Sequence, residues 1–138
     1  MGDPLSVIAS IAAVVHLTRR VVRYLNEVKD ASTVCSRILL EISIASGLLS
    51  NLENLIGDAE SDGTWLDTTK LLSGDNSPLT QFKRSVEQLA TKLAPIAGLR
   101  KAGMAFIWPF KKDELIDLLA DIERQKTLLL LAVQNEHL

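Results

Sequence analysis

Apolar residues recur at spacings of three and four along four long stretches of this chain, which is the period of an α-helix. We expect helices over about residues 4–29, 32–56 and 112–134, and a third helix that begins with Ser77 as its cap and Pro78 in its first turn. The third stripe reaches residue 96, and we expect Pro95 to end or kink that helix. Residues on these stripes should face one another inside a single bundle, among them Ile38, Ile42, Leu89 and Ile122.

The connections between these stretches contain the turn-forming residues of the chain. Residues 57–63 form an acidic loop with a glycine at each end, and a short helix is expected over Trp65–Leu72. Residues 99–110 are punctuated by glycine and proline and are expected to be irregular or partly helical. The expected fold is therefore all-α, a bundle of four long helices plus a short connecting helix, in one domain spanning residues 1–138.

Composition narrows the class of protein. Apolar residues make up 47% of the chain but aromatic residues only 4%, so the core must be aliphatic. The net charge of −2 offers no electrostatic attraction for nucleic acid. A single cysteine, Cys35, excludes an internal disulfide, fits a reducing compartment and falls on an apolar stripe, where we expect a buried, inert thiol. No secretory signal is present, and a cytoplasmic location is expected.

The first helical stretch has an unusual charge distribution. Residues 4–18 contain no Asp, Glu, Lys or Arg, and three arginines follow at once, Arg19, Arg20 and Arg23. Asp3 can cap this helix, and the face opposite the apolar stripe carries small, weakly polar residues such as Ser6, Ala9, Ser10 and Ala13. Such a helix can be buried in a bundle core or can enter a lipid surface. The two interpretations are compatible if the helix is buried in one state of the protein and released in another.

Length limits the membrane interpretation. Fifteen uncharged residues make a helix of about 22 Å, which is shorter than the ~30 Å hydrocarbon core of a bilayer. A stable single-pass anchor is therefore not expected, and membrane attack would need several copies. If the helix enters lipid, the arginines would anchor at the headgroups, and the inserting face would consist of Leu5, Val7, Ile8, Ile11, Val14 and Val15.

A second stretch, residues 100–112, places Phe106, Trp108 and Phe110 between basic residues. Aromatic and basic residues together are typical of a membrane interface, for which Trp108, Lys111 and Lys112 are the candidates. Alternatively, the aromatic side chains cap one end of the bundle core.

The chain offers little for catalysis. No Gly-rich phosphate loop, nucleophile–base spacing or cluster of metal ligands is present, so we expect no enzyme activity, no cofactor and no metal. Lys126 interrupts an apolar heptad, and we expect it to extend to solvent or to pair with a carboxylate such as Glu123 or Asp121.

Both ends of the chain resemble a known family. Residues 3–12, Asp-Pro-Leu-Ser-Val-Ile-Ala-Ser-Ile-Ala, resemble the start of the fungal HeLo-like N-terminal domains of STAND proteins, the fungal NOD-like receptors. Residues 108–115 and 122–128 resemble the closing segment of the same family. Gly2 departs from the usual Met-Asp or Met-Glu start of the family.

The resemblance implies an all-α cell-death execution domain, of the kind that acts in heterokaryon incompatibility and innate immunity, at the N-terminus of a longer protein. It implies self-association into a homo-oligomer on activation, triggered by a receptor or amyloid-signalling partner, and relocation to the plasma membrane. There the N-terminal helix would permeabilise a membrane of anionic lipids. The alternative is a non-lytic protein-interaction or oligomerisation adaptor, in which the first helix never leaves the bundle.

Overall fold

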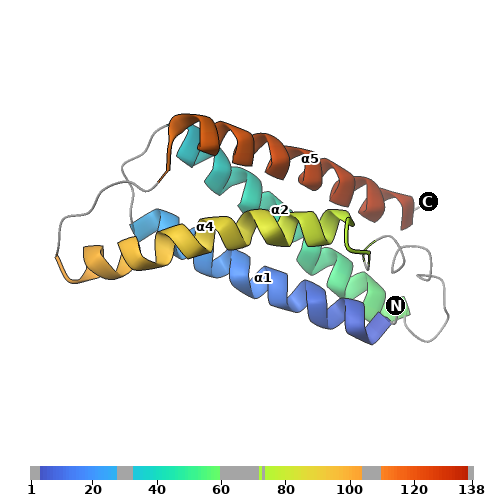
Figure 1. The fold of residues 1–138 in the computed structure, drawn as a ribbon. Coiled ribbons are helices and arrows are strands. Elements are labelled where there is room, and N and C mark those ends of the chain that lie inside the picture. The colour runs from blue at the N-terminus through green and yellow to red at the C-terminus, as the bar shows by residue number, and fades with distance from the viewer. Residues whose placement is uncertain (1–3, 28–32, 60–71, 73, 104–109, 137–138) are drawn as a thin grey trace.

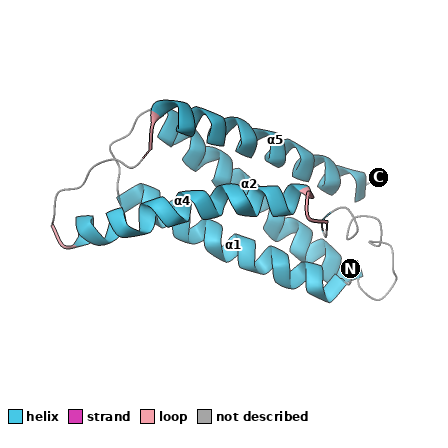
Figure 2. Cartoon of the chain, viewed as in Figure 1, coloured by secondary structure: helices cyan, strands magenta, loops and turns pink. Residues whose placement is uncertain are grey.

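The computed structural model describes residues 4–27, 33–59, 72, 74–103 and 110–136, with the backbone alone at residues 4, 5, 57–59, 100, 133, 135 and 136. Within these residues the chain forms four helices, α1 (Pro4–Glu27), α2 (Thr33–Ala59), α4 (Pro78–Lys101) and α5 (Lys112–Glu136), and no strand (Figures 1 and 2). The expected all-α bundle of four long helices is confirmed. The expected short helix at Trp65–Leu72 and the Asp3 cap lie outside the described residues, except for Leu72, which is buried.

The helices are arranged in a ring. α1 packs against α2 and α4, and α5 packs against the same two helices, so α1 and α5 lie diagonally across the bundle, as do α2 and α4. Figure 1 shows that successive helices run in opposite directions, so that α1 is parallel to α4 and α2 is parallel to α5. The chain between α2 and α4 must therefore join diagonal corners, which fits the long polar connection in the sequence.

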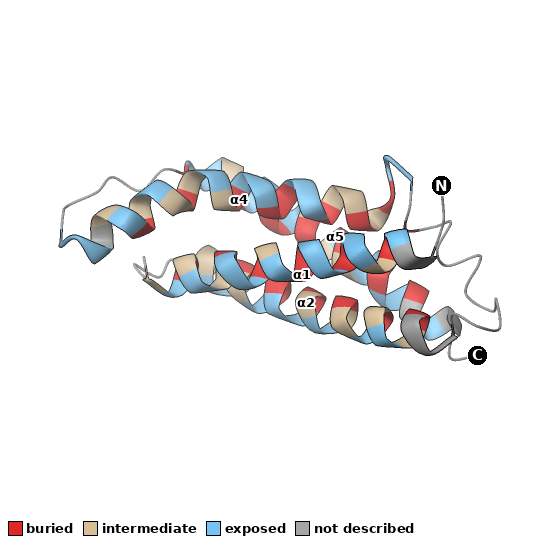
Figure 3. Ribbon diagram, turned by 90° about the horizontal axis from the view of Figure 1, so that it is seen from below, coloured by how far each residue is buried: buried red, intermediate tan, exposed pale blue. Residues whose placement is uncertain are grey.

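The core is aliphatic, as the composition predicted. Each helix turns one stripe inward (Figure 3), and the side chains of Ile38, Ile42, Leu89 and Ile122 are all 1% exposed or less. Among the residues that the structure describes, Phe82 is the largest side chain that is fully buried. Phe110 is also buried, as expected if it caps the core, whereas Phe106 and Trp108 lie outside the described residues. Cys35 is half-buried against this core rather than fully buried.

The start of α4 is fixed by a serine cap. The Ser77 hydroxyl accepts a hydrogen bond from the Thr80 N–H (3.2 Å) and donates one to the Leu72 carbonyl (3.1 Å). Pro78 occupies the first helical position, where its missing N–H leaves no bond unmade. The cap predicted from the sequence is therefore confirmed, and it also ties Leu72 to the helix start.

Pro95 was expected to end or kink this helix, and the first of these two expectations is wrong. α4 continues past Pro95 to Lys101, and the helix stops where Gly103 adopts a left-handed conformation (φ 71°). Proline removes one hydrogen bond to the carbonyl of Thr91, but Thr91 is exposed, so water can satisfy that oxygen. Burial of Leu93 and Ala97 on either side of Pro95 holds the helix together through this position.

Replacing Ser77 by alanine should lower the free energy of unfolding by about 1–2 kcal/mol, because a buried cap loses its bond to the Thr80 N–H. The measurement is urea unfolding followed by circular dichroism. Ser43→Ala is the matched control, since the exposed Ser43 hydroxyl only bonds the Leu39 carbonyl within its own helix and should change stability little. Equal losses in the two variants would contradict the assignment of Ser77 as the cap.

Candidate membrane interface

The expected inserting face of α1 is part of the bundle core. Val7, Ile11, Val14 and Val15 are at most 5% exposed, and Ile8 is half-buried against them. The side chain of Leu5 lies outside the described part of the chain. Val21 and Thr18 are also fully buried, which extends the buried stripe into the second half of the helix. In this state the face is closed to a membrane, so lipid contact requires α1 to leave the bundle.

The opposite face of α1 is exposed and uncharged through its first half. It carries Ser6, Ala9, Ser10, Ala12, Ala13 and His16. Two hydroxyls on this helix bond within it, since Ser10 donates to the Ser6 carbonyl (3.0 Å) and Thr18 donates to the Val14 carbonyl (2.7 Å). Because these bonds move with the helix, both hydroxyls would stay satisfied in an apolar environment.

Polar contacts tie α2, α4 and α5 together. Arg37 on α2 pairs with Glu123 on α5 (2.8 Å), and Lys126 on α5 pairs with Glu41 on α2. Between α4 and α5, Lys92 pairs with Glu114, and the Ser85 hydroxyl meets the Gln125 amide oxygen (3.4 Å). The expected partners of Lys126, Glu123 and Asp121, are wrong, because Glu123 binds Arg37 and Asp121 binds Arg124.

α1 is attached differently. Among the described residues, its one polar contact with another helix is a long ion pair between Glu27 and Lys101, at 3.7 Å. The Lys101 side chain is 74% exposed, and such a pair contributes little to stability. α1 is therefore held by burial of its aliphatic stripe, whereas the other three helices are also joined to one another by specific polar contacts.

Five of the predicted membrane-interface residues lie toward the same end of the bundle, on the diagonal helices α1 and α5 and at the residue before α5. Arg19, Arg20 and Arg23 lie on the second half of α1 and are exposed, and Lys111 and Lys112 are exposed at the start of α5. Figure 1 shows the end of α1 and the start of α5 at the same end of the molecule, far from the N-terminus. We call these five residues the basic end. Arg20 packs over the Tyr24 ring (6.0 Å to the centroid), and Trp108 lies outside the described residues.

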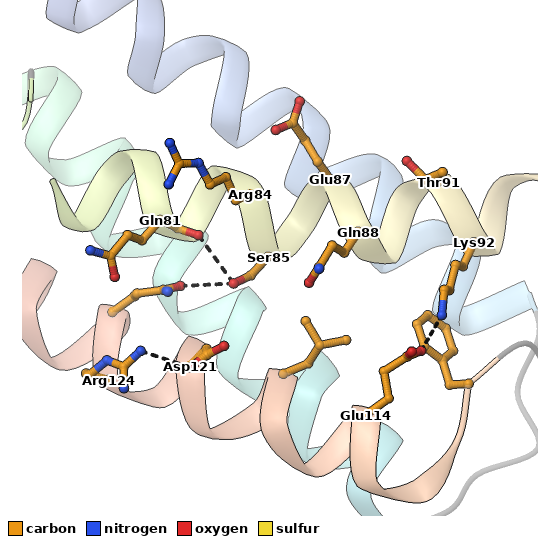
Figure 4. Close-up of a pocket in the computed structure, with 13 residues that line it drawn as sticks. Gln81, Arg84, Ser85, Glu87, Gln88, Thr91, Lys92, Glu114, Asp121 and Arg124 are labelled. Carbon is orange, nitrogen blue, oxygen red and sulfur yellow. Dashed lines mark hydrogen bonds and ion pairs between the residues drawn. The ribbon is translucent and has the colours of Figure 1, made fainter. Parts of the chain in front are cut away.

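A polar groove between α4 and α5 was not expected from the sequence. It encloses about 670 Å³ and is lined by both signs of charge, with Lys92 and Glu114 meeting across it (Figure 4). Buried Ser85 and Gln125 form its floor, and both are polar residues at stripe positions, which is the signal that could have revealed it. Its three cations are matched in number by three carboxylates, so the groove has no net charge with which to select a charged ligand.

Two further properties of the described residues bear on function. Within the described residues, no group of three or more His, Cys, Asp or Glu side chains gathers where it could hold a metal ion. α2, over residues 33–56, is the described helix that is long and apolar enough to cross a membrane, a test that core helices of soluble proteins also pass. Only 28% of its apolar stretch is buried, however, so much of that surface faces outward.

No known protein family, curated protein or solved structure matches this chain. Function must therefore be argued from the attachment of α1, the basic end and the exposed apolar surface.

The two kinds of attachment predict different costs of mutation. Lys126→Met leaves the Glu41 carboxylate, whose side chain is 11% exposed, without its cation, and should lower the free energy of unfolding by about 3 kcal/mol. Lys101→Met, which breaks only the exposed pair with Glu27, should cost less than about 1 kcal/mol. Urea unfolding compares the two variants with the parent chain.

A second change separates a lost ion pair from lost packing. Adding Glu41→Leu to Lys126→Met removes the unpaired buried charge and should recover most of the loss. If the double variant is no more stable than Lys126→Met alone, the cost lies in packing of the lysine stem and not in the orphaned carboxylate.

Proposed function

We propose that this chain is a membrane-targeting cell-death execution domain that oligomerises on activation and permeabilises the plasma membrane through α1. The observation that carries the proposal is the attachment of α1. This helix is uncharged over its first half, and burial of its aliphatic stripe is nearly all that joins it to α2 and α4, each of which also makes polar contacts with α5. α1 is thus the helix that can leave while the others keep their polar contacts.

Energetics explain why release would need a membrane. Exposing the buried side chains Val7, Ile11, Val14, Val15, Val21 and Leu25 to water would cost roughly 9–18 kcal/mol, at ~1.5–3 kcal/mol for each. That is comparable with the whole stability of a domain, about 5–15 kcal/mol, so α1 stays closed in water. Lipid receives these side chains as favourably as the core does, so contact with a bilayer removes the part of the cost that comes from α1 itself.

The basic end supplies the first contact. Each Lys or Arg near an anionic surface contributes about 1 kcal/mol, so the basic end contributes at most roughly 5 kcal/mol when all five residues reach that surface. This end also carries the last turn of α1, where the helix continues into the rest of the chain. If α1 turns over about that end, its uncharged half reaches the bilayer while Arg19, Arg20 and Arg23 remain among the headgroups.

The docking step predicts a charge effect that depends on position. Arg19→Gln with Arg23→Gln should weaken binding to vesicles containing phosphatidylserine about 30-fold, from the loss of about 2 kcal/mol. Lys83→Gln with Arg84→Gln removes the same charge from exposed positions near the start of α4, at the other end of the bundle, and should change binding little. Vesicle co-sedimentation at fixed salt measures both. Equal weakening by the two double variants would mean that net charge, and not the basic end, controls binding.

The insertion step is tested on the exposed face of α1. Ser10→Asp should leave the bundle folded, because Ser10 is exposed in this state. A carboxylate within a helix at mid-bilayer costs about 2.5–3.5 kcal/mol, so dye release from anionic vesicles should fall by roughly a hundredfold. The control is Thr91→Asp, an exposed position on α4. Dye release by Ser10→Asp at the level of the parent chain would exclude α1 as the inserting helix.

The second candidate is a non-lytic interaction or oligomerisation adaptor. The observation in its favour is the exposed apolar surface of α2 and α5, where Leu40 is 58% and Leu131 is 50% exposed. Self-association without dye release, with and without forced clustering, would favour this function over membrane attack.

A further inference from the structure

The exposed side of α2 is uncharged over most of its length. Between Arg37 and Glu53 the exposed positions are Leu40, Ser43, Ile44, Gly47 and Asn51. The single charge within this span, Glu41, is turned inward and paired with Lys126. Single exposed leucines are ordinary on protein surfaces, but a charge-free helix face of about four turns is not typical of a helix that water covers.

α5 extends this surface. The pairs Arg37–Glu123 and Glu41–Lys126 join residues 86 and 85 positions apart in two parallel helices. With the same two offsets Ile44 lies level with Leu129 and Leu130, of which Leu129 is buried and Leu130 is 38% exposed. We call the five exposed α2 positions, together with Leu130, the α2 face.

Gly47 gives this face its shape. A Cβ atom built on Gly47 would meet nothing within 4 Å, so no contact within the described residues requires glycine here. Glycine inside a helix is nevertheless destabilising relative to alanine. Ser43, Gly47 and Asn51 follow one another at a spacing of four and form a shallow groove along the helix. Leu40 and Ile44 begin the neighbouring ridge, and another helix can pack closely against such a groove.

We propose that a second copy of this chain covers the α2 face, with the two α2 helices crossing in parallel about a two-fold axis near Gly47. In that arrangement each residue near the axis meets its own counterpart, so a charged face would repel itself, and this one carries no charge. The rim holds both signs, in the exposed pair of Arg37 and Glu123. A strongly charged partner or an anionic bilayer would instead select a rim of one sign.

The surface area that the α2 face can bury limits the affinity of the proposed dimer. From Arg37 to Glu53, α2 extends about 24 Å, and two neighbouring helices are about 20 Å wide, so a dimer that covers this whole span would bury on the order of 1,000 Å² in total. That is the lower limit for a specific interface, and it predicts a reversible dimer. The inference deepens the proposed function and rests on it in one respect, since it assigns the surface for the self-association that membrane attack requires.

Sedimentation of the full chain over a wide concentration range, without membranes, tests the proposal. The parent chain should dimerise reversibly, and Ile44→Glu should weaken association about a hundredfold or more, because two carboxylates would be buried at the axis. The matched control is Ile116→Glu, which changes an isoleucine of nearly equal exposure (44% against 43%) outside the α2 face. Gly47→Ala should raise thermal stability and weaken association, a combination that a purely structural role would not produce.

Cross-linking fixes the orientation and traps a weak dimer. In a Cys35→Ser background, Gly47→Cys and Ser43→Cys should each form disulfide-linked dimers under mild oxidation, whereas Thr91→Cys on the diagonal helix α4 should not. Cross-linking at 47 but not at 43 would show antiparallel helices and overturn the parallel arrangement. A monomeric parent chain with no cross-linking at 47, equal effects of the two isoleucine variants, or association only on vesicles would each overturn the proposal. Because none of these assays measures dye release, a failure here is distinguishable from a failure of membrane attack.

Discussion

Burial of the aliphatic stripe of α1 is the interaction on which the rest of this structure depends. Val14 and Ile11 occupy the space that α2 and α4 leave between them, and no directional bond fixes them there. Water drives this packing, and its strength is set by area and not by a specific partner. The position of α1 therefore depends almost entirely on burial, whereas α2 and α4 are also joined to α5 by ion pairs in which α1 takes no part.

Local periodicity was sufficient to predict the helices and their inward faces. Ile42 and Leu89 lie in the core because a spacing of three and four selects one side of a helix, whatever packs against it. The same reasoning could not find the partner of Lys126. Glu41 lies 85 residues away on a helix whose neighbours depend on the ring order, and local spacing carries no information about that order. Pro95 shows the complementary error, since burial on both sides of it outweighs a local preference for ending the helix.

The candidate membrane interface was predictable in its parts and not in its assembly. Arg19 and Lys112 belong to segments far apart in the sequence, and only the up-and-down arrangement of the helices places them at one end. Whether α1 packs in the bundle or enters lipid could not be predicted from the sequence either, because an apolar face suits a protein core and a bilayer equally. The exposed face of α2 could not be predicted for a related reason. An apolar helix is expected to be buried all round, and the exposed fraction of Leu40 is a property of the assembled bundle.

The basic end and the α2 face are oriented so that both can be used at the same time. α2 begins at the basic end and runs away from it, so the α2 face lies along the side of a bundle that stands on a membrane by that end. A parallel two-fold axis keeps both basic ends on the same surface, whereas an antiparallel dimer would point one of them away from the bilayer. An interface near 1,000 Å² is weak in solution, but copies confined to one surface with a common orientation have a much higher effective concentration. Docking by the basic end would then promote pairing through α2, and pairing would place two α1 helices, each too short to span alone, above the same patch of membrane.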